Sequence, residues 1–276
     1  MICRCRRADG RGTIENMSSW MQVGRRSLEP EMMDDPALSH ERHVAALRGL
    51  ERINRWSGSV GIVWAAIREL VRGLGGESLR VPDVGGTGAL TGPATVGQPL
   101  RVLDLATGAG DVPIGLARRA RRAGVLLEIE ACDASPTALE YARQRAARAG
   151  ADVRFFLLDV LGGDFPAGYD VVVSSLFLHH LSEEAAVLLL RKMAAAARRL
   201  VVVNDLLRSR RGLALAYLAP RLLTTSKVVH VDAVRSVRAA FKLDEVHTLA
   251  GQAGLGGVVL WRCWPQRYAL VWRRHA

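Results

Sequence analysis

From residue 100 onward, short apolar runs alternate with segments of helical periodicity. The apolar runs are rich in Val and Leu and fall at residues 101–105, 126–132, 153–158, 169–173 and 200–203. Apolar residues recur at helical spacing in residues 112–123, 136–149 and 183–197. Continuous apolar strands are typical of parallel sheets that are covered on both faces. The pattern therefore predicts an α/β fold with a doubly wound, mostly parallel sheet.

Other parts of the chain depart from this alternation. The runs "GVVLWRCWP" and "QRYALVWRR" follow each other closely and predict a C-terminal antiparallel hairpin. A mostly helical insertion at about residues 206–240 lies within the main domain, residues 100–276. Residues 37–75 predict a helical lid, and the Gly- and Pro-rich residues 76–99 predict a flexible linker. Residues 1–36 show no sustained period and are predicted to be a mostly disordered tail.

The chain is basic, with 38 Lys and Arg against 27 Asp and Glu and a formal net charge of +11. This charge is compatible with an anionic partner, nucleic acid or membrane, and equally with the codon usage of a GC-rich genome. An aromatic content of 5% gives few stacking platforms for single-stranded nucleic acid. The cysteines have no zinc-type spacing, and no apolar run could span a membrane. We therefore expect no metal and a cytoplasmic location.

Polar residues end every strand of the predicted parallel set. Ligands of doubly wound sheets bind beyond the carboxyl ends of the strands, so these residues predict a shared ligand site. Single residues of this kind also form turns, and that alternative stays open for Asp159 and Ser174. The residues are Asp104, Asp133, Asp159, Ser174 with Ser175, and Asn204 with Asp205.

The loop "ATGAGD", residues 106–111, follows the first predicted strand. A dinucleotide site needs a third glycine for close helix packing, and Pro113 takes its place here. Asp111 would also begin the helix at which a pyrophosphate docks, which sets anion against anion. These residues disfavour a nicotinamide oxidoreductase. A ligand with an amine, a sulfonium and a ribose, such as S-adenosylmethionine, suits carboxylates on both sides of the loop.

Three stretches together resemble the class I S-adenosylmethionine-dependent methyltransferases, in particular the type of ubiquinone and menaquinone biosynthesis. They are "VLDLATGAGD", "EACDASPTALEYAR" and "YDVVVSSLFLHHL", in that order, within a likeness that covers about residues 40–273. The resemblance implies a Rossmann-like, seven-stranded methyltransferase fold and S-adenosylmethionine as cofactor. Ala106 departs from the first glycine of the family's loop motif.

The resemblance also implies roles for single residues. Asp104 would orient the methionine amine, and Asp133 would accept both ribose hydroxyls. Ala134 would lie against the adenine, and Asp159 with Val160 would meet its amino group. The full implied set is Asp104, Ala106, Thr107, Gly108, Gly110, Asp111, Asp133, Ala134, Asp159, Val160 and Ser174.

His179 and His180 follow the fourth predicted strand and are the candidates for a catalytic base. A phenolic acceptor would benefit from such a base, whereas the alternative is that one histidine caps a helix and the other packs beneath it. Asn204 and Asp205 could orient the acceptor instead. Residues 54–56, Asn-Arg-Trp, occupy the place of a lid residue in related enzymes.

The insertion bears on the acceptor. "LLRSRRGLALAYLAPRLL" is apolar with flanking arginines, so it predicts either a wall of the acceptor pocket or a helix at a membrane surface. With "RINRW", it resembles methyltransferases associated with type III polyketide synthases, which implies a phenolic-lipid or quinol acceptor. We expect an apolar small-molecule partner, peripheral contact with the inner membrane face, and no nucleic acid. A nucleic-acid methyltransferase or binding protein is the alternative, although Ser174-Ser175-Leu176-Phe177 stands where base-amine methylases carry an N/D-P-P-Y/F tetrapeptide.

Overall fold

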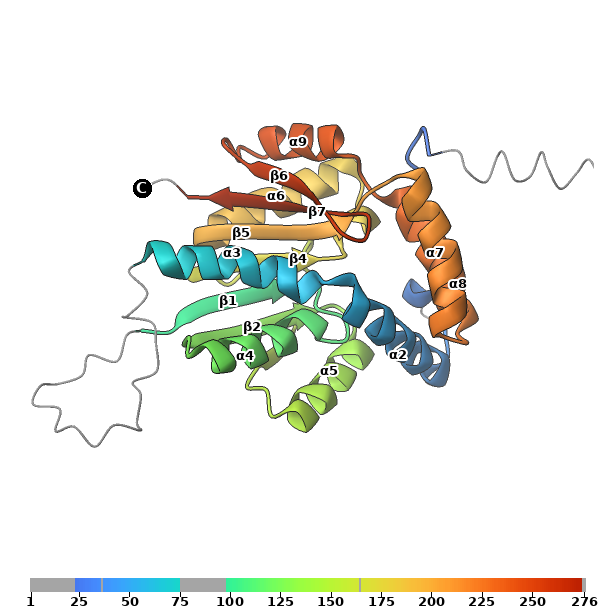
Figure 1. The fold of residues 1–276 in the computed structure, drawn as a ribbon, viewed down its shortest axis with the longest axis horizontal. Coiled ribbons are helices and arrows are strands. Elements are labelled where there is room, and N and C mark those ends of the chain that lie inside the picture. Colours follow the sequence, from blue (N-terminus) through green and yellow to red (C-terminus); the bar gives the residue numbers. More distant parts are fainter. Residues whose placement is uncertain (1–22, 36, 75–97, 164, 275–276) are drawn as a thin grey trace, which may run out of the picture.

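The computed structural model describes residues 23–35, 37–74, 98–163 and 165–274. Within these residues, seven strands form one sheet in the order β3-β2-β1-β4-β5-β7-β6 (Figure 1). The strands are β1 (Leu100–Leu105), β2 (Leu127–Asp133), β3 (Arg154–Leu157), β4 (Tyr169–Ser175), β5 (Ala197–Leu206), β6 (Val259–Cys263) and β7 (Arg267–Arg273).

The sheet confirms the predicted fold. β1 to β5 pair in parallel, whereas β7 is antiparallel to both β5 and β6. The chain moves outward from β1 to β3 and then returns to place β4 on the other side of β1. This reversal is the point at which doubly wound sheets bind their ligands.

Helices cover both faces of the sheet. α3 (Ser59–Gly73), α4 (Asp111–Ala123) and α5 (Pro136–Ala149) pack on one face, where Val102 and Val171 are fully buried. α6 (Glu183–Ala196) and α9 (Leu243–Gln252) pack on the other face. The hydroxyls of Ser135 and Ser182 cap α5 and α6 by accepting backbone N–H groups.

A helical cap lies beyond the carboxyl ends of the strands. It consists of α2 (His40–Ser57), α7 (Arg210–Leu223) and α8 (Lys227–Ala239), which contact one another (Figure 1). α2 and α3 fall in the predicted helical lid, and α7 and α8 in the predicted insertion. Of the predicted linker, residues 76–97 lie outside the described residues. No helix among the described residues is long and apolar enough to cross a membrane.

Residues 23–35 differ from the expectation of a mostly disordered tail. Met32–Asp34 form the short 3₁₀ helix η1, which packs against α8. The Asp232 carboxylate on α8 accepts the backbone N–H groups of Met32 and Met33 at 2.8 and 3.0 Å. The partner of this segment is a helix about 200 residues away along the chain, so the local sequence pattern carries no sign of it.

Candidate active site

The carboxyl ends of the strands and the helical cap enclose a cavity of about 570 Å³. Its polar part is formed by the loop after β1 and the turn after β4. Its apolar part is formed by the cap, with Leu47, Leu50 and Ile53 of α2 and Ala216 and Ala219 of α7. One cavity thus joins a polar rim to an apolar chamber.

Asp104 lies in β1 at the base of this rim and is 2% exposed. Its Oδ2 accepts a hydrogen bond from the Thr107 hydroxyl at 2.6 Å, whereas its Oδ1 is buried without a partner among the described residues. Burial raises the pKa of Asp104 to about 7, with a further increase from the charges of Asp133 and Asp111. A ligand cation at Oδ1 would satisfy this atom and favour the ionised carboxylate.

The loop after β1 lines the cavity with residues 106–109. Gly108 and Gly110 have φ angles of +53° and +74°, and Ala106 has φ of +51°. Positive φ costs a residue with a Cβ atom about 1–2 kcal/mol, so the loop is strained at Ala106. The other described non-glycine residues with positive φ, Leu176 and Gln266, also line the cavity. Backbone strain therefore gathers at this site.

Asp133 ends β2 beside the glycine loop. Its two oxygens accept the backbone N–H groups of Gly108, at 2.7 Å, and Ser135, at 2.9 Å. The carboxylate thus fixes the loop and α5 in relation to each other. Each oxygen has further acceptor capacity, so the geometry leaves room for ligand hydroxyls.

Asp111 begins α4 and lines the cavity, but its charge is already paired. Arg145 of α5 donates to its Oδ1 at 2.5 Å, and Asn54 of α2 donates to its Oδ2 at 2.9 Å. Arg145 also forms an ion pair with Glu51 of α2 at 3.1 Å. This network fastens the lid helix to the glycine loop. The side chains of Arg55 and Trp56 lie outside the described part of the chain.

Gly110 and Asp133 are not among the residues that line the cavity, and the remaining predicted cofactor residues do not line it either. Ala134 is exposed, and Asp159 accepts the N–H of Leu161 within its own turn at 2.9 Å. Val160 is buried in the core beneath α6. Ser174 is fully buried, and its hydroxyl has no partner among the described residues. Its neighbour Ser175 faces the cavity instead, since adjacent strand residues point to opposite sides.

His179 lies in η3 (Leu178–His180), the turn after β4, and is 3% exposed. Its Nδ1 is 2.6 Å from Oδ1 of Asp205, which ends β5, and its backbone N–H donates to Oδ2 of the same carboxylate at 3.0 Å. Desolvation lowers the pKa of His179, but the charges of Asp205 and Glu31 outweigh it and raise the pKa to about 10. Asp205 therefore acts on the site through His179.

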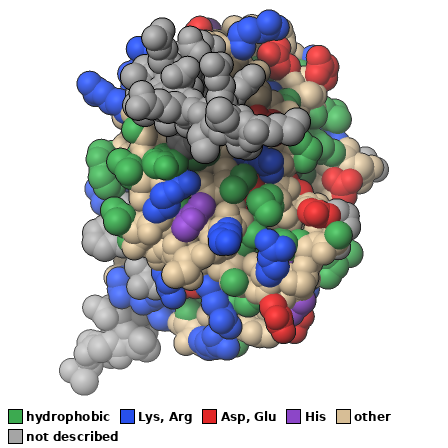
Figure 2. Space-filling view, turned by 90° about the vertical axis from the view of Figure 1, so that its right-hand side faces the viewer, with side chains coloured by type: hydrophobic (Ala, Val, Ile, Leu, Met, Phe, Trp, Pro, Cys, Tyr) green, Lys and Arg blue, Asp and Glu red, His purple; other side chains and the backbone are tan. Residues whose placement is uncertain are grey.

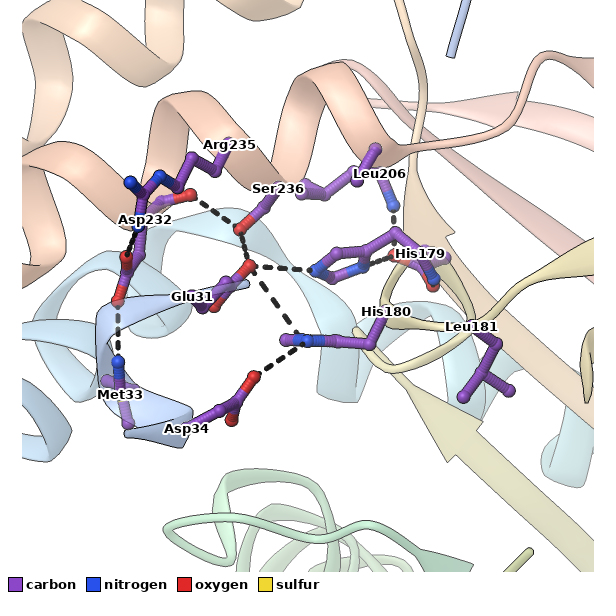
Figure 3. A network of polar contacts seen from close by, with 12 residues as sticks. Glu31, Met33, Asp34, His179, His180, Leu181, Leu206, Asp232, Arg235 and Ser236 are labelled. Carbon is purple, nitrogen blue, oxygen red and sulfur yellow. Dashed lines mark hydrogen bonds and ion pairs between the residues drawn. The ribbon is translucent and has the colours of Figure 1, made fainter. Parts of the chain in front are cut away.

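Glu31 and His180 complete a histidine cluster, defined here as Glu31, His179 and His180 (Figure 3). Oε1 of Glu31 lies 3.8 Å from Nε2 of His179 and 3.9 Å from Nε2 of His180. Nδ1 of His180 lies 3.5 Å from Oδ2 of Asp34. Burial raises the pKa of Glu31, but hydrogen bonding and charge from the two histidines give a net decrease.

Arg267 adds a buried cation to the cavity wall, where it pairs in register with Leu206 of β5. It is 3% exposed, begins β7 and donates to the Ser59 hydroxyl. Desolvation lowers its pKa to about 10 against the opposing charge of Asp205. Sequence analysis missed Arg267, Glu31 and Asp34. None lies in a motif. The antiparallel β7 brings Arg267 to the cavity, and the packing of η1 brings Glu31 there and places Asp34 beside His180.

Comparison with known proteins gives these residues a context. Residues 102–199, which include the loop after β1, match the family model described as "Methyltransferase domain". The match covers less than half of the chain. The matched residues are similar to class I methyltransferases, a family that uses S-adenosylmethionine.

Several methyltransferases are similar to parts of this chain. A stretch of 75 residues is 43% identical to demethylmenaquinone methyltransferase of Thermus thermophilus, and it spans 27% of this chain and 32% of that protein. Magnesium protoporphyrin IX methyltransferase of Synechocystis PCC 6803, solved with bound SAH, shares the fold with a TM-score of 0.51, 16% identity and 95% coverage of both chains. An O-methyltransferase family protein from Burkholderia thailandensis has a TM-score of 0.49, 19% identity and coverage of 65% of this chain and 52% of its own.

The rim of the domain fits S-adenosylmethionine on its own geometry. The buried, unpartnered Oδ1 of Asp104 suits a ligand ammonium group. A Cβ added at Gly108 would meet nothing within 4 Å, so open space adjoins the loop backbone. Asp133 lies directly beyond this backbone, where a ribose could reach it.

Proposed function

We propose that the protein transfers a methyl group from S-adenosylmethionine to a small apolar acceptor with a phenolic or quinol hydroxyl. The observation that carries this proposal is the continuity of the cavity. The carboxylate of Asp104 and the apolar side chains of Leu50 and Ala216 line the same space. A cationic cofactor and an apolar acceptor could therefore meet without bulk water between them.

Asp104, Gly108 and Asp133 would hold the cofactor. Asp104 would pair with its ammonium group, the backbone at Gly108 would lie against it, and Asp133 would accept from its ribose. Bound S-adenosylmethionine supplies an electrophilic methyl group on a positively charged sulfur. The protein's main task is then to align the acceptor oxygen with the methyl carbon, because positioning supplies most of the rate.

The histidine cluster would receive the acceptor hydroxyl. It forms a polar part of a chamber whose walls at α2 and α7 are largely apolar, so a phenol would place its hydroxyl at the cluster and its hydrocarbon part against these two helices. The O–H proton would pass to His180 of this cluster as the bond between carbon and oxygen forms and the bond between carbon and sulfur breaks, because the raised pKa of His179 keeps that imidazole protonated at neutral pH. His179 and His180 remain the predicted catalytic residues.

The outer face of α7 supports a lipid-like acceptor drawn from a membrane surface. Leu215, Leu218 and Leu222 are 40%, 57% and 84% exposed, and Leu215 also lines the cavity. Arg211 and Arg221 are exposed on the same helix. Figure 2, viewed from the side of α2, α7 and α8, shows hydrophobic and basic side chains on one face. Apolar side chains among arginines suit an anionic membrane surface, and the cavity opens beside them.

Mass spectrometry tests the proposed reaction. The protein is incubated with deuteromethyl-labelled S-adenosylmethionine and a series of phenols and quinols with increasing alkyl chain length. We expect a product in which CD₃ replaces a hydroxyl hydrogen, with faster turnover for longer chains. Replacing His179 and His180 by Gln should lower the rate about 10²–10⁴-fold. The exposed His247, replaced by Gln, is the matched control. Transfer only to polar acceptors or to nucleic acid would contradict the proposal.

A further inference from the structure

The histidine cluster brings together three metal-binding side chains from two distant parts of the chain. Glu31 precedes η1, whereas His179 and His180 belong to the turn after β4. One donor atom from each residue lies within 4.8 Å of the other two. Zinc bound tetrahedrally at about 2.0–2.2 Å separates its ligand atoms by roughly 3.3 Å. The two distances to Oε1 of Glu31, 3.8 and 3.9 Å, exceed this value only slightly.

Each histidine has a carboxylate on the ring nitrogen that points away from Glu31. Nδ1 of His179 is 2.6 Å from Asp205, and Nδ1 of His180 is 3.5 Å from Asp34. Both Nε2 atoms therefore face Glu31 (Figure 3). Metal-binding histidines almost always donate their second ring N–H to such a group, which fixes the tautomer and the ring orientation. His179 has this arrangement, and His180 has a carboxylate at ion-pair distance on the same side of its ring.

The third ligand is also held in place from outside. The Ser236 hydroxyl of α8 donates to Oε1 of Glu31. The guanidinium of Arg26 donates to the carbonyl oxygens of His179 and Leu181 at 2.8 and 2.6 Å. These contacts tie residues 26–31 to the turn that carries both histidines. The donor atoms are thus gathered by the fold itself, before any ion is considered.

We propose that Glu31, His179 and His180 bind a divalent cation of the zinc type. Two imidazoles and one carboxylate are a common set for catalytic zinc, in which a fourth position stays open. All three side chains line the cavity, so the open position would face the acceptor chamber. The acceptor oxygen would occupy that open position, and this part of the inference rests on the proposed function.

With the ion bound, the three side chains of the cluster would be its ligands, so the ion would take the place of the protein base described under the proposed function. A cation lowers the pKa of an oxygen ligand, so a phenol would lose its proton to the surrounding solution on coordination. The phenolate oxygen would then form the bond to the methyl carbon. The electron pair of the breaking carbon–sulfur bond would stay on sulfur, and no oxidation or reduction takes place.

Metal binding is measured on the full chain after treatment with a chelator and dialysis. Zinc sulfate is titrated in competition with a chromogenic chelator, and bound zinc is counted by elemental analysis. We expect one equivalent per chain. Glu31→Gln and His180→Ala should each weaken the affinity at least tenfold, whereas His247→Ala should leave it unchanged. Both variants replace partly exposed side chains, so circular dichroism is expected to show an intact fold.

Two further readouts separate this inference from the proposed function. Adenosylhomocysteine binding, measured by calorimetry, should be the same in Glu31→Gln, His180→Ala and the unaltered chain. Methyl transfer to a phenol should fall at least tenfold after chelation and return with zinc. Absence of zinc binding, or binding that survives both substitutions, would overturn the site. Methyl transfer at the full rate by the chelated protein would overturn the role of the ion. Failure of the unaltered chain to bind adenosylhomocysteine would count against the proposed function instead.

Discussion

Nδ1 of His179 lies 2.6 Å from Oδ1 of Asp205, and the same carboxylate accepts the backbone N–H of His179. Asp205 ends β5 and His179 follows β4, so two neighbouring parallel strands place the pair at the carboxyl edge of the sheet. Because Nδ1 is occupied, Nε2 is the ring nitrogen that faces Glu31 and the cavity. The pair therefore sets the direction in which the imidazole can act.

Asp205→Asn tests this positioning role. Asparagine can still accept the backbone N–H of His179 but brings no negative charge to Nδ1. We expect the zinc affinity to fall about 10–100-fold, and methyl transfer to fall with it. Adenosylhomocysteine affinity should stay within about a factor of three of the unaltered chain, since Asp104 and Asp133 are unchanged. A loss of adenosylhomocysteine binding equal to the loss of zinc binding would indicate general unfolding of the site.

The pKa of Asp104 predicts how cofactor affinity depends on pH. Burial raises this pKa to about 7, and a ligand ammonium binds only the ionised form. Below pH 7 the proton must leave before binding, so the affinity for adenosylhomocysteine should rise by up to about tenfold per pH unit between pH 5 and 7. Above that range, ionisation of Asp104 adds no further gain.

Asp104→Asn is the matched variant for this titration. It keeps the shape of the side chain and leaves the ionisation of the ligand itself unaltered. We expect its affinity at pH 8 to be about 10–100-fold lower, because a charged hydrogen bond is lost. Its affinity should also change little between pH 5 and 7. Calorimetry measures the affinity for adenosylhomocysteine against pH in both proteins. Parallel curves would show that the pH dependence comes from a group other than Asp104.

The backbone conformation at Ala106 predicts that a substitution by glycine stabilises the folded protein. Ala106 has φ of +51°, a conformation that disfavours a Cβ atom. Ala106→Gly should raise the free energy of unfolding by about 0.5–1 kcal/mol, because relief of strain exceeds the entropy that glycine loses on folding. Ala109, buried in the same loop and without a positive φ, is the control. Urea denaturation measures the free energy of unfolding of both variants, and Ala109→Gly should lower it. An equal decrease in both variants would contradict backbone strain at Ala106.

The exposed leucines of α7 predict membrane binding. Replacing Leu218 and Leu222 together by Gln should lower the partition into vesicles that contain anionic phospholipid by about tenfold, since apolar area is lost from the contact. Leu188 on α6 is 43% exposed, lies outside the cap and provides the control. Sedimentation with vesicles at low and high salt measures the effect. If the double variant binds vesicles as well as the unaltered chain, α7 is not the part of the protein that contacts the membrane.

The sequence predicts the fold and the centre of the rim because their signals are local. Each strand is a continuous apolar run, and Asp104 and Asp133 stand directly at strand ends. In contrast, Ser174 and Ser175 are both polar, and only the register of β4 shows that Ser175 faces the cavity. The pairing of Asp111 with Arg145 likewise depends on the packing of α5 beside α4, which no local pattern indicates.

The histidine cluster marks the limit of what the sequence could predict. His179 and His180 are evident because two histidines follow a strand. Glu31 is not, since it lies in a polar segment without helical or strand period. Its contact with His179 joins two distant parts of the chain and depends on Asp232 of α8, which holds η1 in place. Long-range packing of this kind becomes visible only in the folded chain.

The central claim is that the carboxylates at this edge of the sheet bind the cofactor. Calorimetry tests this claim most directly, by titration of adenosylhomocysteine into the unaltered chain and into two variants of Asp133. We predict one equivalent bound by the unaltered chain, about 10–100-fold weaker binding by Asp133→Asn, and none detectable by Asp133→Ala, with circular dichroism spectra unchanged. Affinity unchanged in both variants, or binding of NADH in place of adenosylhomocysteine, would contradict the account.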